Sequence, residues 1–257
     1  MSIKHKTAKK DSSLKNDSIV ILFKGGRLPS WHRLSDQKRK NYSQKHVNLM
    51  LSISQKYSLL HMEGFVLLSP QIHWERFWII EFPSLEGAEA WIKAEMEPPY
   101  GRYGFYEYYL SRRNPTKTFN NFVTQPEGLL STESTSDPYQ IPHLKADYNS
   151  TLILNFRRWV PGADNISSKL RGDKRRQLLL QSIAQQHNLI RLEKFQLIAP
   201  QSNFHEVNLV EFPTIEAATL WMEAETNQPY GQFRLQIMHL AHRWAPQYFQ
   251  NWVPKNL

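Results

Sequence analysis

Short apolar runs alternate with longer stretches of helical periodicity along this chain. Four runs in the first half are rich in β-branched and aromatic residues and bounded by turn-forming residues, which predicts strands at 18–24, 64–69, 77–82 and 105–110. Apolar residues three or four apart predict a helix over 36–60, and Pro83-Ser84 begins a second helix that the serine can cap. We expect Gly25-Gly26 to end the first strand. The predicted order is strand, helix, strand, strand, helix, strand.

The same order returns in the second half, because the sequence repeats itself. The stretch Glu81–Trp91 (EFPSLEGAEAW) recurs at Glu211–Trp221 (EFPTIEAATLW), a spacing of 130 residues, and a Pro-Tyr-Gly turn around Tyr100 recurs around Tyr230. The second set of elements is expected as strands at 151–156, 194–199, 207–212 and 235–240 and helices at 173–187 and 215–225. The chain is therefore a head-to-tail duplication of one α+β unit.

This order of elements is that of the ferredoxin-like unit, a four-stranded antiparallel sheet with both helices on one face. Side chains alternate between the two faces of a strand, and in the second half both sets are apolar: Phe195 and Leu197 belong to one, Val210 and Met238 to the other. One face of each sheet is expected to meet the helices and the other the sister sheet. We predict an α+β fold of two tandem ferredoxin-like βαββαβ units, packed sheet to sheet as a fused pseudo-dimeric α+β barrel.

The boundaries divide the chain into a lysine-rich tail at 1–17, a first repeat at 18–123, a Ser- and Pro-containing linker at 124–148 and a second repeat at 149–257. Of the 257 residues, 40% are hydrophobic and 21% are charged, which is the composition of a folded protein. A monomer with an intramolecular pseudo-dimer fits this organisation, and the oligomeric state stays open.

The pattern Glu-Phe-Pro-Ser-Leu-Glu-x-Ala-x-x-Trp at Glu81–Trp91 resembles the dimeric α+β barrel superfamily, within it the small uncharacterised domains with an EFPS-x-E-A-x-x-W signature. Leu34-Ser35 with Tyr42 and His46 also resembles the first helix of EthD-type members, although the Tyr-to-His spacing is one residue shorter. Such members bind small, often aromatic or quinone-like molecules in a cleft between helices and sheet. Some are cofactor-free monooxygenases, isomerases, cyclases or dehydratases, and several bind haem. The resemblance implies a small organic ligand and allows haem, while the cofactor stays unknown.

His46 and Tyr42 are the candidate catalytic residues. They lie four residues apart in the first long predicted helix and so share one face. An imidazole beside a phenol can relay a proton at neutral pH, which proton abstraction from an enolisable substrate requires. The alternative is a surface histidine on a basic helix. Arg176 takes the matching position in the second half, so any such site would exist in the first half only.

Matched charged residues follow the third and fourth strands of each half: Glu81 and Arg113, and Glu211 and Arg243. Together with Tyr100 they are the candidate ligand-binding residues, because a carboxylate there can act as a base or hold a cation. The alternative for the four charged residues is a pair of ion pairs, which we favour. For Tyr100 the alternative is a plug at the end of the sheet.

The absence of cysteine excludes disulfides, thiolate nucleophiles and Cys-ligated metals, and fits a cytoplasmic protein. No metal site is predicted, because His239 and His242 lie three residues apart on the last strand and so on opposite faces. No apolar run is long enough to span a membrane, and the polar first residues argue against a secretory signal. Trp91 and Trp221, on the apolar faces of the second helices, are expected in the core.

A formal net charge of +9, with basic clusters at 38–40 and 174–176, indicates an acidic partner such as nucleic acid or an acidic protein. The sequence therefore supports two hypotheses. The first is a small-molecule-binding barrel, with proton transfer of the isomerase, lyase or monooxygenase type as its candidate activity. The second is a non-catalytic module that binds through the basic clusters. A cavity lined by His46 would favour the first, and a continuous basic face across both repeats the second. Ligand, reaction and pathway are not specified.

Overall fold

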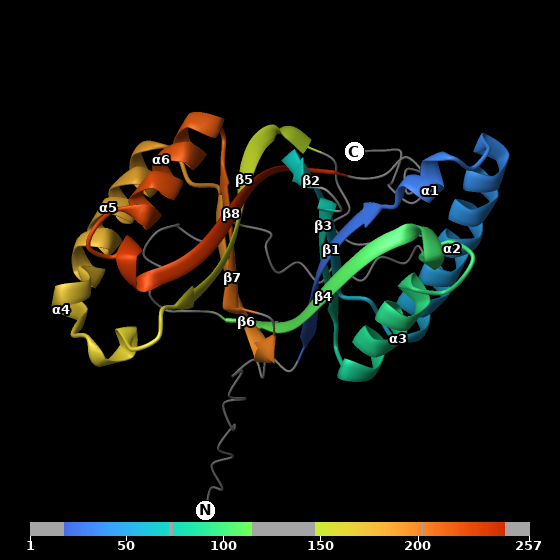
Figure 1. Cartoon of the computed structure of the whole chain (residues 1–257), viewed down its shortest axis with the longest axis horizontal. Helices are drawn as coiled ribbons and strands as arrows, with labels where there is room; N and C mark the ends of the chain where they lie inside the picture. Colours follow the sequence, from blue (N-terminus) through green and yellow to red (C-terminus); the bar gives the residue numbers. More distant parts are fainter. Residues whose placement is uncertain (1–17, 72–73, 115–146, 202, 245–257) are drawn as a thin grey trace, which may run out of the picture.

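The computed structural model describes residues 18–71, 74–114, 147–201 and 203–244. Within these residues, the strands close into one antiparallel barrel in the order β1-β3-β2-β8-β5-β7-β6-β4, and helices cover two opposite sides of it (Figure 1). The predicted tail at 1–17 and residues 124–146 of the predicted linker lie outside the described part. The last two residues of that linker lie in β5 (Asp147–Trp159).

The first half holds the elements of one ferredoxin-like unit. They are β1 (Ile19–Arg27), α1 (Pro29–His32), α2 (Asp36–Lys56), β2 (His61–Gln71), β3 (Trp74–Phe82), α3 (Leu85–Glu95), the 3-10 turn η1 (Gly101–Tyr103) and β4 (Gly104–Arg113). In the sheet their order is β4-β1-β3-β2, antiparallel throughout. This arrangement brings the first and third strands to the centre of the sheet.

The second half repeats the plan. After β5 come η2 (Ala163–Asn165), α4 (Ser168–Arg171), α5 (Asp173–Gln186), β6 (Arg191–Gln201), β7 (Phe204–Phe212), α6 (Ile215–Thr226), η3 (Gly231–Phe233) and β8 (Arg234–Arg243). The sheet order is β8-β5-β7-β6. Each predicted strand and helix is present, although most strands extend beyond their predicted limits.

The two sheets are joined at their edges as well as through their faces. β2 pairs with β8 around Val66 and His242, and β4 pairs with β6 around Arg112 and Gln196. Every strand of the barrel therefore has a neighbour on both sides, which leaves no open edge for pairing with another chain. The predicted fold class is confirmed: two ferredoxin-like units form one pseudo-dimeric α+β barrel.

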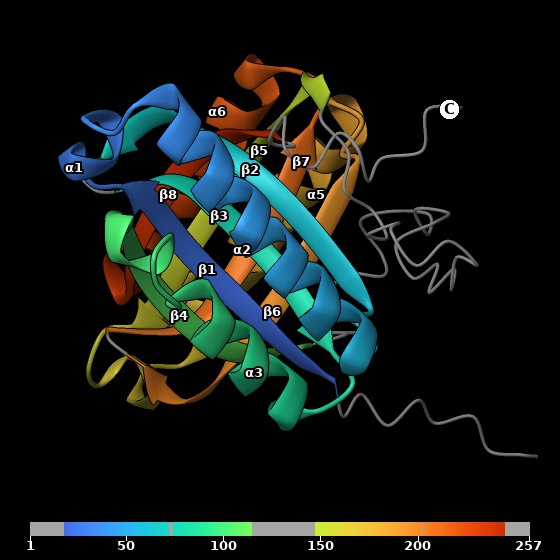
Figure 2. The ribbon, with the colours of Figure 1, turned by 90° about the vertical axis from the view of Figure 1, so that its right-hand side faces the viewer.

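Both faces of each sheet are buried, as the apolar alternation predicts. On β1, Val20 and Leu22 point into the barrel, whose interior is filled by both halves, while Ile21 packs under the helices. Figure 2 shows α2 and α3 lying across the outer face of the first sheet. Trp91 and Trp221 anchor the outer clusters at 0% and 1% exposure, which confirms them as core residues.

The second helix of each half begins as predicted. The Ser84 hydroxyl accepts a hydrogen bond from the backbone N–H of Gly87 at 3.3 Å, and Thr214 accepts one from Ala217 at 3.2 Å. Such caps satisfy backbone donors that the first helical turn leaves unpaired. Among the described helices, none has the length and apolar character to cross a membrane.

The first strand departs from the prediction in a way that matters for the site. Gly25-Gly26 does not end β1, which continues to Arg27. Val20 pairs with Glu81, while Leu152 pairs with Glu211, so the first strands correspond at a spacing of 132 residues and the rest of the repeat at 130. The connection from first strand to long helix is thus two residues shorter in the second half. As a result, Gly25 corresponds to Arg157.

Candidate functional site

A hollow lies between the helices and the outer face of the sheet in the first half. It encloses about 430 Å³, counting the solvent in its mouth. Its walls come from β1, β2, β3, β4, α2, α3 and the turn after α3. The lining residues are Phe23, Gly25, Gly26, Arg27, His46, Met62, Arg76, Trp78, Glu95, Tyr100 and Tyr106. Aromatic and aliphatic side chains thus surround a small number of charged groups, the usual composition of a ligand pocket.

His46 stands on α2 at the wall of this hollow and is 5% exposed, so the alternative of a surface histidine is wrong. Its Nε2 lies 3.2 Å from Oε2 of Glu95 on α3. Its ring stacks on Tyr100, with centroids 3.9 Å apart and planes 13° apart. Its Nδ1 is buried without a hydrogen-bond partner among the described residues. Packing of α2 on α3 therefore fixes the imidazole by one nitrogen and leaves the other uncommitted.

Arg27, the last residue of β1, stacks on the same tyrosine. Its guanidinium carbon lies 3.8 Å from the ring centre of Tyr100 and 4.9 Å from that of Trp31. Two planar groups this close to one ring centre cannot share a face, so Tyr100 lies between Arg27 and His46. Nη1 of Arg27 is buried, and no described residue accepts a hydrogen bond from it. Arg76, on the neighbouring strand β3, is a second guanidinium at the hollow.

The hollow exists because β1 carries a glycine where β5 carries an arginine. Arg157, which corresponds to Gly25, is 3% exposed, and its guanidinium pairs with Glu206 and lies 3.6 Å from Glu225. Asn208 also faces it. These three partners correspond to Arg76, Glu95 and Trp78, which line the hollow of the first half. The Arg157 side chain therefore occupies in the second half a space that is shared in the first by the ring of Phe23, which lies over Gly25, and by the hollow.

Ion pairs replace the histidine pair in the second half. Arg176, the counterpart of His46, binds Glu225 through Nε at 2.7 Å and stacks over Tyr230 at 4.3 Å. Burial alone would raise the pKa of Glu225, but Arg176 and Arg157 hold it below its ordinary value. In the same way Arg157, Lys194 and Arg234 overcome burial and lower the pKa of Glu206 to about 2. What remains open is a smaller hollow of about 230 Å³ without lining residues from the sheet.

The other predicted catalytic residue lies apart from the hollow. Tyr42 stacks on Tyr103, with centroids 6.1 Å apart, and is not among the lining residues, although it shares a helix with His46. Tyr100, predicted as a ligand-binding residue, does line the hollow. Glu95, Arg27 and Arg76 were missed. Only the correct strand pairing could have shown that the two arginines line the same hollow as His46, because nothing in their local sequence marks them.

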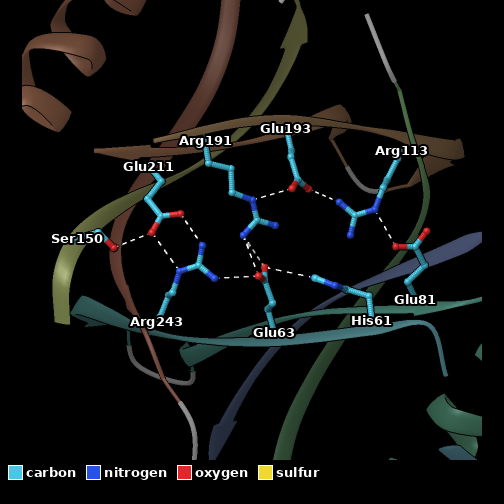
Figure 3. A network of polar contacts seen from close by, with 9 residues as sticks. All are labelled: His61, Glu63, Glu81, Arg113, Ser150, Arg191, Glu193, Glu211 and Arg243. Carbon is cyan, nitrogen blue, oxygen red and sulfur yellow. Dashed lines mark hydrogen bonds and ion pairs between the residues drawn. The ribbon is translucent and has the colours of Figure 1, made fainter. Parts of the chain in front are cut away.

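The remaining predicted ligand residues form a buried network at one end of the barrel (Figure 3). Nε of Arg113 lies 2.7 Å from Glu81, and Nη2 of Arg243 lies 2.6 Å from Glu211, so the favoured ion pairs are present. Each arginine also reaches a carboxylate of the other half: Arg113 pairs with Glu193 and Arg243 with Glu63. None of these residues lines the hollow.

Arg191 joins the two sides of this network. Its Nη1 lies 2.7 Å from Glu63 and its Nε lies 2.6 Å from Glu193, while His61 Nε2 approaches Glu63 at 3.5 Å. Burial opposes ionisation of Glu63, but Arg191, His61 and Arg243 hold its pKa well below the ordinary value. The carboxylates are therefore charged in the folded state and depend on their guanidinium partners.

The described residues do not fit a haem at the hollow. A haem macrocycle is larger than a hollow of this volume. Across the described part of the chain, no three His, Asp or Glu side chains cluster closely enough to hold a metal ion.

Replacing Arg191 by methionine should destabilise the protein by about 3–5 kcal/mol, because Glu63 and Glu193 stay buried with fewer partners. Arg39→Met is the control, since Arg39 pairs with Asp36 on the exposed face of α2, and it should cost less than about 1 kcal/mol. Urea unfolding measures both values. Equal effects of the two substitutions would show that the network contributes no more than a surface pair.

His239 lies at the opposite end of the barrel, 4.3 Å from Trp74 between ring centroids. Burial, and then the charge of Lys24, lower its pKa to about 4 from an ordinary 6.5. Between pH 6.5 and 4, His239 therefore binds a proton in the unfolded chain but not in the folded state. The free energy of unfolding consequently falls as the pH drops from 6.5 to 4. His239→Phe should reduce this loss, as urea unfolding at several pH values will show. Carboxyl groups titrate in both wild type and variant, so only the difference between the two pH profiles reports on His239. Identical profiles would contradict the prediction.

The comparisons agree with this architecture. No protein-family model and no curated protein match the chain. A mutant chlorite dismutase from Candidatus Nitrospira defluvii is similar in structure, with a TM-score of 0.60 and 10% identity over 91% of this chain and 94% of that one. The same enzyme in complex with imidazole has a TM-score of 0.59 and 11% identity over 90% and 92%. This likeness shows the fold alone, a dimeric α+β barrel whose two ferredoxin-like units lie in one polypeptide.

Proposed function

We propose that this chain binds a small organic molecule in the hollow of its first half. The observation that carries the proposal is the exchange of Arg157 for Gly25, since one half fills a space that the other half keeps open. A buried space lined by charged groups is costly unless a ligand or water satisfies those groups. The chlorite dismutase structures support the fold that carries the site.

The lining favours a flat or unsaturated ligand of small size. Phe23, Trp78 and Tyr106 offer aromatic surface, while the polar groups converge from α2, α3 and β1. The hollow is small, because its volume of about 430 Å³ includes the solvent in its mouth. A ligand built on a single ring therefore fits it better than a fused ring system.

The pair of His46 and Glu95 supports proton transfer as the activity. A proton leaves an enolisable C–H bond of the ligand for Nδ1 of His46, and the electron pair of that bond forms the enolate. Glu95, 3.2 Å from Nε2, stabilises the imidazolium that results. This assignment replaces Tyr42 by Glu95 as the partner of the histidine, and it is of the isomerase or lyase type.

The alternative, a module that binds nucleic acid or an acidic protein, has less support. The basic cluster at 38–40 lies on α2 and that at 174–176 on α5, and these helices stand at opposite ends of the molecule (Figure 1). Tyr106 and Tyr108 of β4 pack against the outer core of the first half. Aromatic side chains in that position are covered by helices, whereas base stacking needs an exposed aromatic platform.

The hollow can be closed by restoring the arrangement of the second half. Gly25→Arg with Arg76→Glu places an arginine beside two glutamates, and the ring of Phe23, whose end lies 2.6 Å from the position of a new Cβ, has to shift to admit it. We expect wild-type protein to bind members of a panel of benzoate, benzamide and benzyl alcohol by tryptophan fluorescence, and the variant to bind none. The control variant, Leu178→Arg with Lys174→Glu, introduces an arginine and a glutamate at exposed positions of α5, and it should bind the probes as the wild type does. Binding by the closed variant would place the ligand elsewhere.

Proton transfer is measured as exchange of C–H for C–D in heavy water, with phenylacetone and phenylpyruvate as enolisable probes. The wild-type protein should accelerate the exchange of at least one probe. His46→Gln should lower that rate by roughly 10²–10⁴-fold, the usual contribution of a general base. Tyr42→Phe should leave it unchanged, because Tyr42 does not line the hollow. An unchanged rate in His46→Gln would remove the histidine from the mechanism.

A further inference from the structure

We infer that the ligand of the hollow is an anion, a small monocarboxylic acid with an aromatic or unsaturated body, held by Arg27 with Arg76 beside it. This inference rests on the proposed function and adds the chemical class of the ligand. It follows from the positions at which the two halves carry opposite charges.

Arg27 holds its guanidinium in a position that suits an anion. Its guanidinium is flattened against Tyr100 and Trp31, so its donors can be used only at the edge of the group. Nη1 is buried and donates to no described residue. A buried donor without an acceptor costs on the order of 1–3 kcal/mol, and more when it belongs to a charged group. A carboxylate matches the guanidinium edge with parallel hydrogen bonds and removes this cost.

Equivalent positions of the third strands carry opposite charges, Arg76 in the first half and Glu206 in the second. In the second half a guanidinium fills the space, and the side chain that faces it from the third strand is the carboxylate of Glu206. In the first half the space is open, and the corresponding side chain is the guanidinium of Arg76. The charge at this position is negative in the second half and positive in the first. The group that occupies the space is positive in the second half, so a negative group is favoured in the first.

The negative charge at the hollow, that of Glu95, already has a partner. Glu95 lies 3.2 Å from His46, and the two side chains are 11% and 4% exposed. Glu95 therefore serves the histidine, and Arg27 is the charged group at the hollow whose Nη1 has no described partner, with Arg76 as a second positive charge on the same wall. Phe23, Trp78 and Tyr106 would surround its apolar part, which distinguishes an organic acid from inorganic phosphate or sulfate.

Tyr100 also fixes how such an acid would lie. Because its ring separates Arg27 from His46, the carboxylate and the carbon that loses a proton belong to different parts of the ligand. This condition is met by an acid in which the carbon that loses the proton is not bonded directly to the carboxylate carbon, such as a 2-oxo acid.

The test compares acids with their uncharged amides. The probes are benzoate, phenylacetate and cinnamate, each paired with its amide, and binding is measured by isothermal titration calorimetry. In wild-type protein at least one acid should bind roughly tenfold or more tightly than its amide, as a charge-assisted pair implies. Its affinity should fall as salt is added, while that of the amide stays constant.

Two variants separate the possible results. Arg27→Gln should remove the preference for the acid and leave amide binding unchanged, whereas Arg175→Gln, on the exposed side of α5, should change neither; circular dichroism confirms that both are folded. Amides that bind as tightly as their acids, with both lost when Gly25→Arg and Arg76→Glu close the hollow, would overturn the anion inference and keep the proposed function. Absence of binding by every probe, or binding that survives the closed hollow, would overturn both.

Discussion

The structure depends on the burial of two sheet faces against each other inside one closed barrel. Neither ferredoxin-like unit could keep its inner face from water alone, because Leu22, Phe65 and Phe77 of the first half pack with Leu154 and Phe156 of the second. Edge pairing of β2 with β8 and β4 with β6 then removes the free strand edges that a separate unit would expose. The duplication is therefore a single folding unit, in which each half supplies part of the other's core.

Charged groups follow the same rule at the end of the barrel. The carboxylate of Glu63 is buried and is bonded by Arg191 and Arg243 of the second half. That of Glu193, which is largely buried, is bonded by Arg113 of the first half and Arg191 of the second. A buried ion pair contributes little net stability compared with apolar residues, but the loss of one partner is costly. The arrangement thus disfavours any other register of one half against the other, since a shift would leave several buried charges without partners. This explains why the matched residues Glu81, Arg113, Glu211 and Arg243 are structural members of a network instead of parts of a pocket.

The sequence predicted the repeat, the order of elements and the closed fold because these depend on periodic apolar positions, which are visible locally. It predicted His46 and Tyr100 as site residues, but it did not predict the hollow that they line, because the hollow depends on one change of spacing. The repeat is constant at 130 residues from the long helix onward, and at that spacing Gly25 would correspond to Asn155; the pairing of Val20 and Leu152 gives a spacing of 132 in the first strand and makes Arg157 its counterpart. Composition predicts that Gly25-Gly26 ends a strand, whereas a glycine in a strand also marks a place where another group approaches the backbone closely. His46 was found from its chemistry, but its partner Glu95 lies on another helix and only the packing brings them together.

The difference between the halves follows from the same constraint. Once two copies share a core, the outer face of each sheet can change without loss of the barrel, provided that its own helices stay packed. The second half filled the space under its helices with Arg157, Glu206 and Glu225, whose charges satisfy one another. The first half keeps the space open and holds a guanidinium nitrogen of Arg27 and the Nδ1 of His46 without described partners. An arrangement that leaves two buried donor or acceptor groups unsatisfied among the described residues lowers stability unless a further partner satisfies them, which is the physical reason to place the ligand in this half.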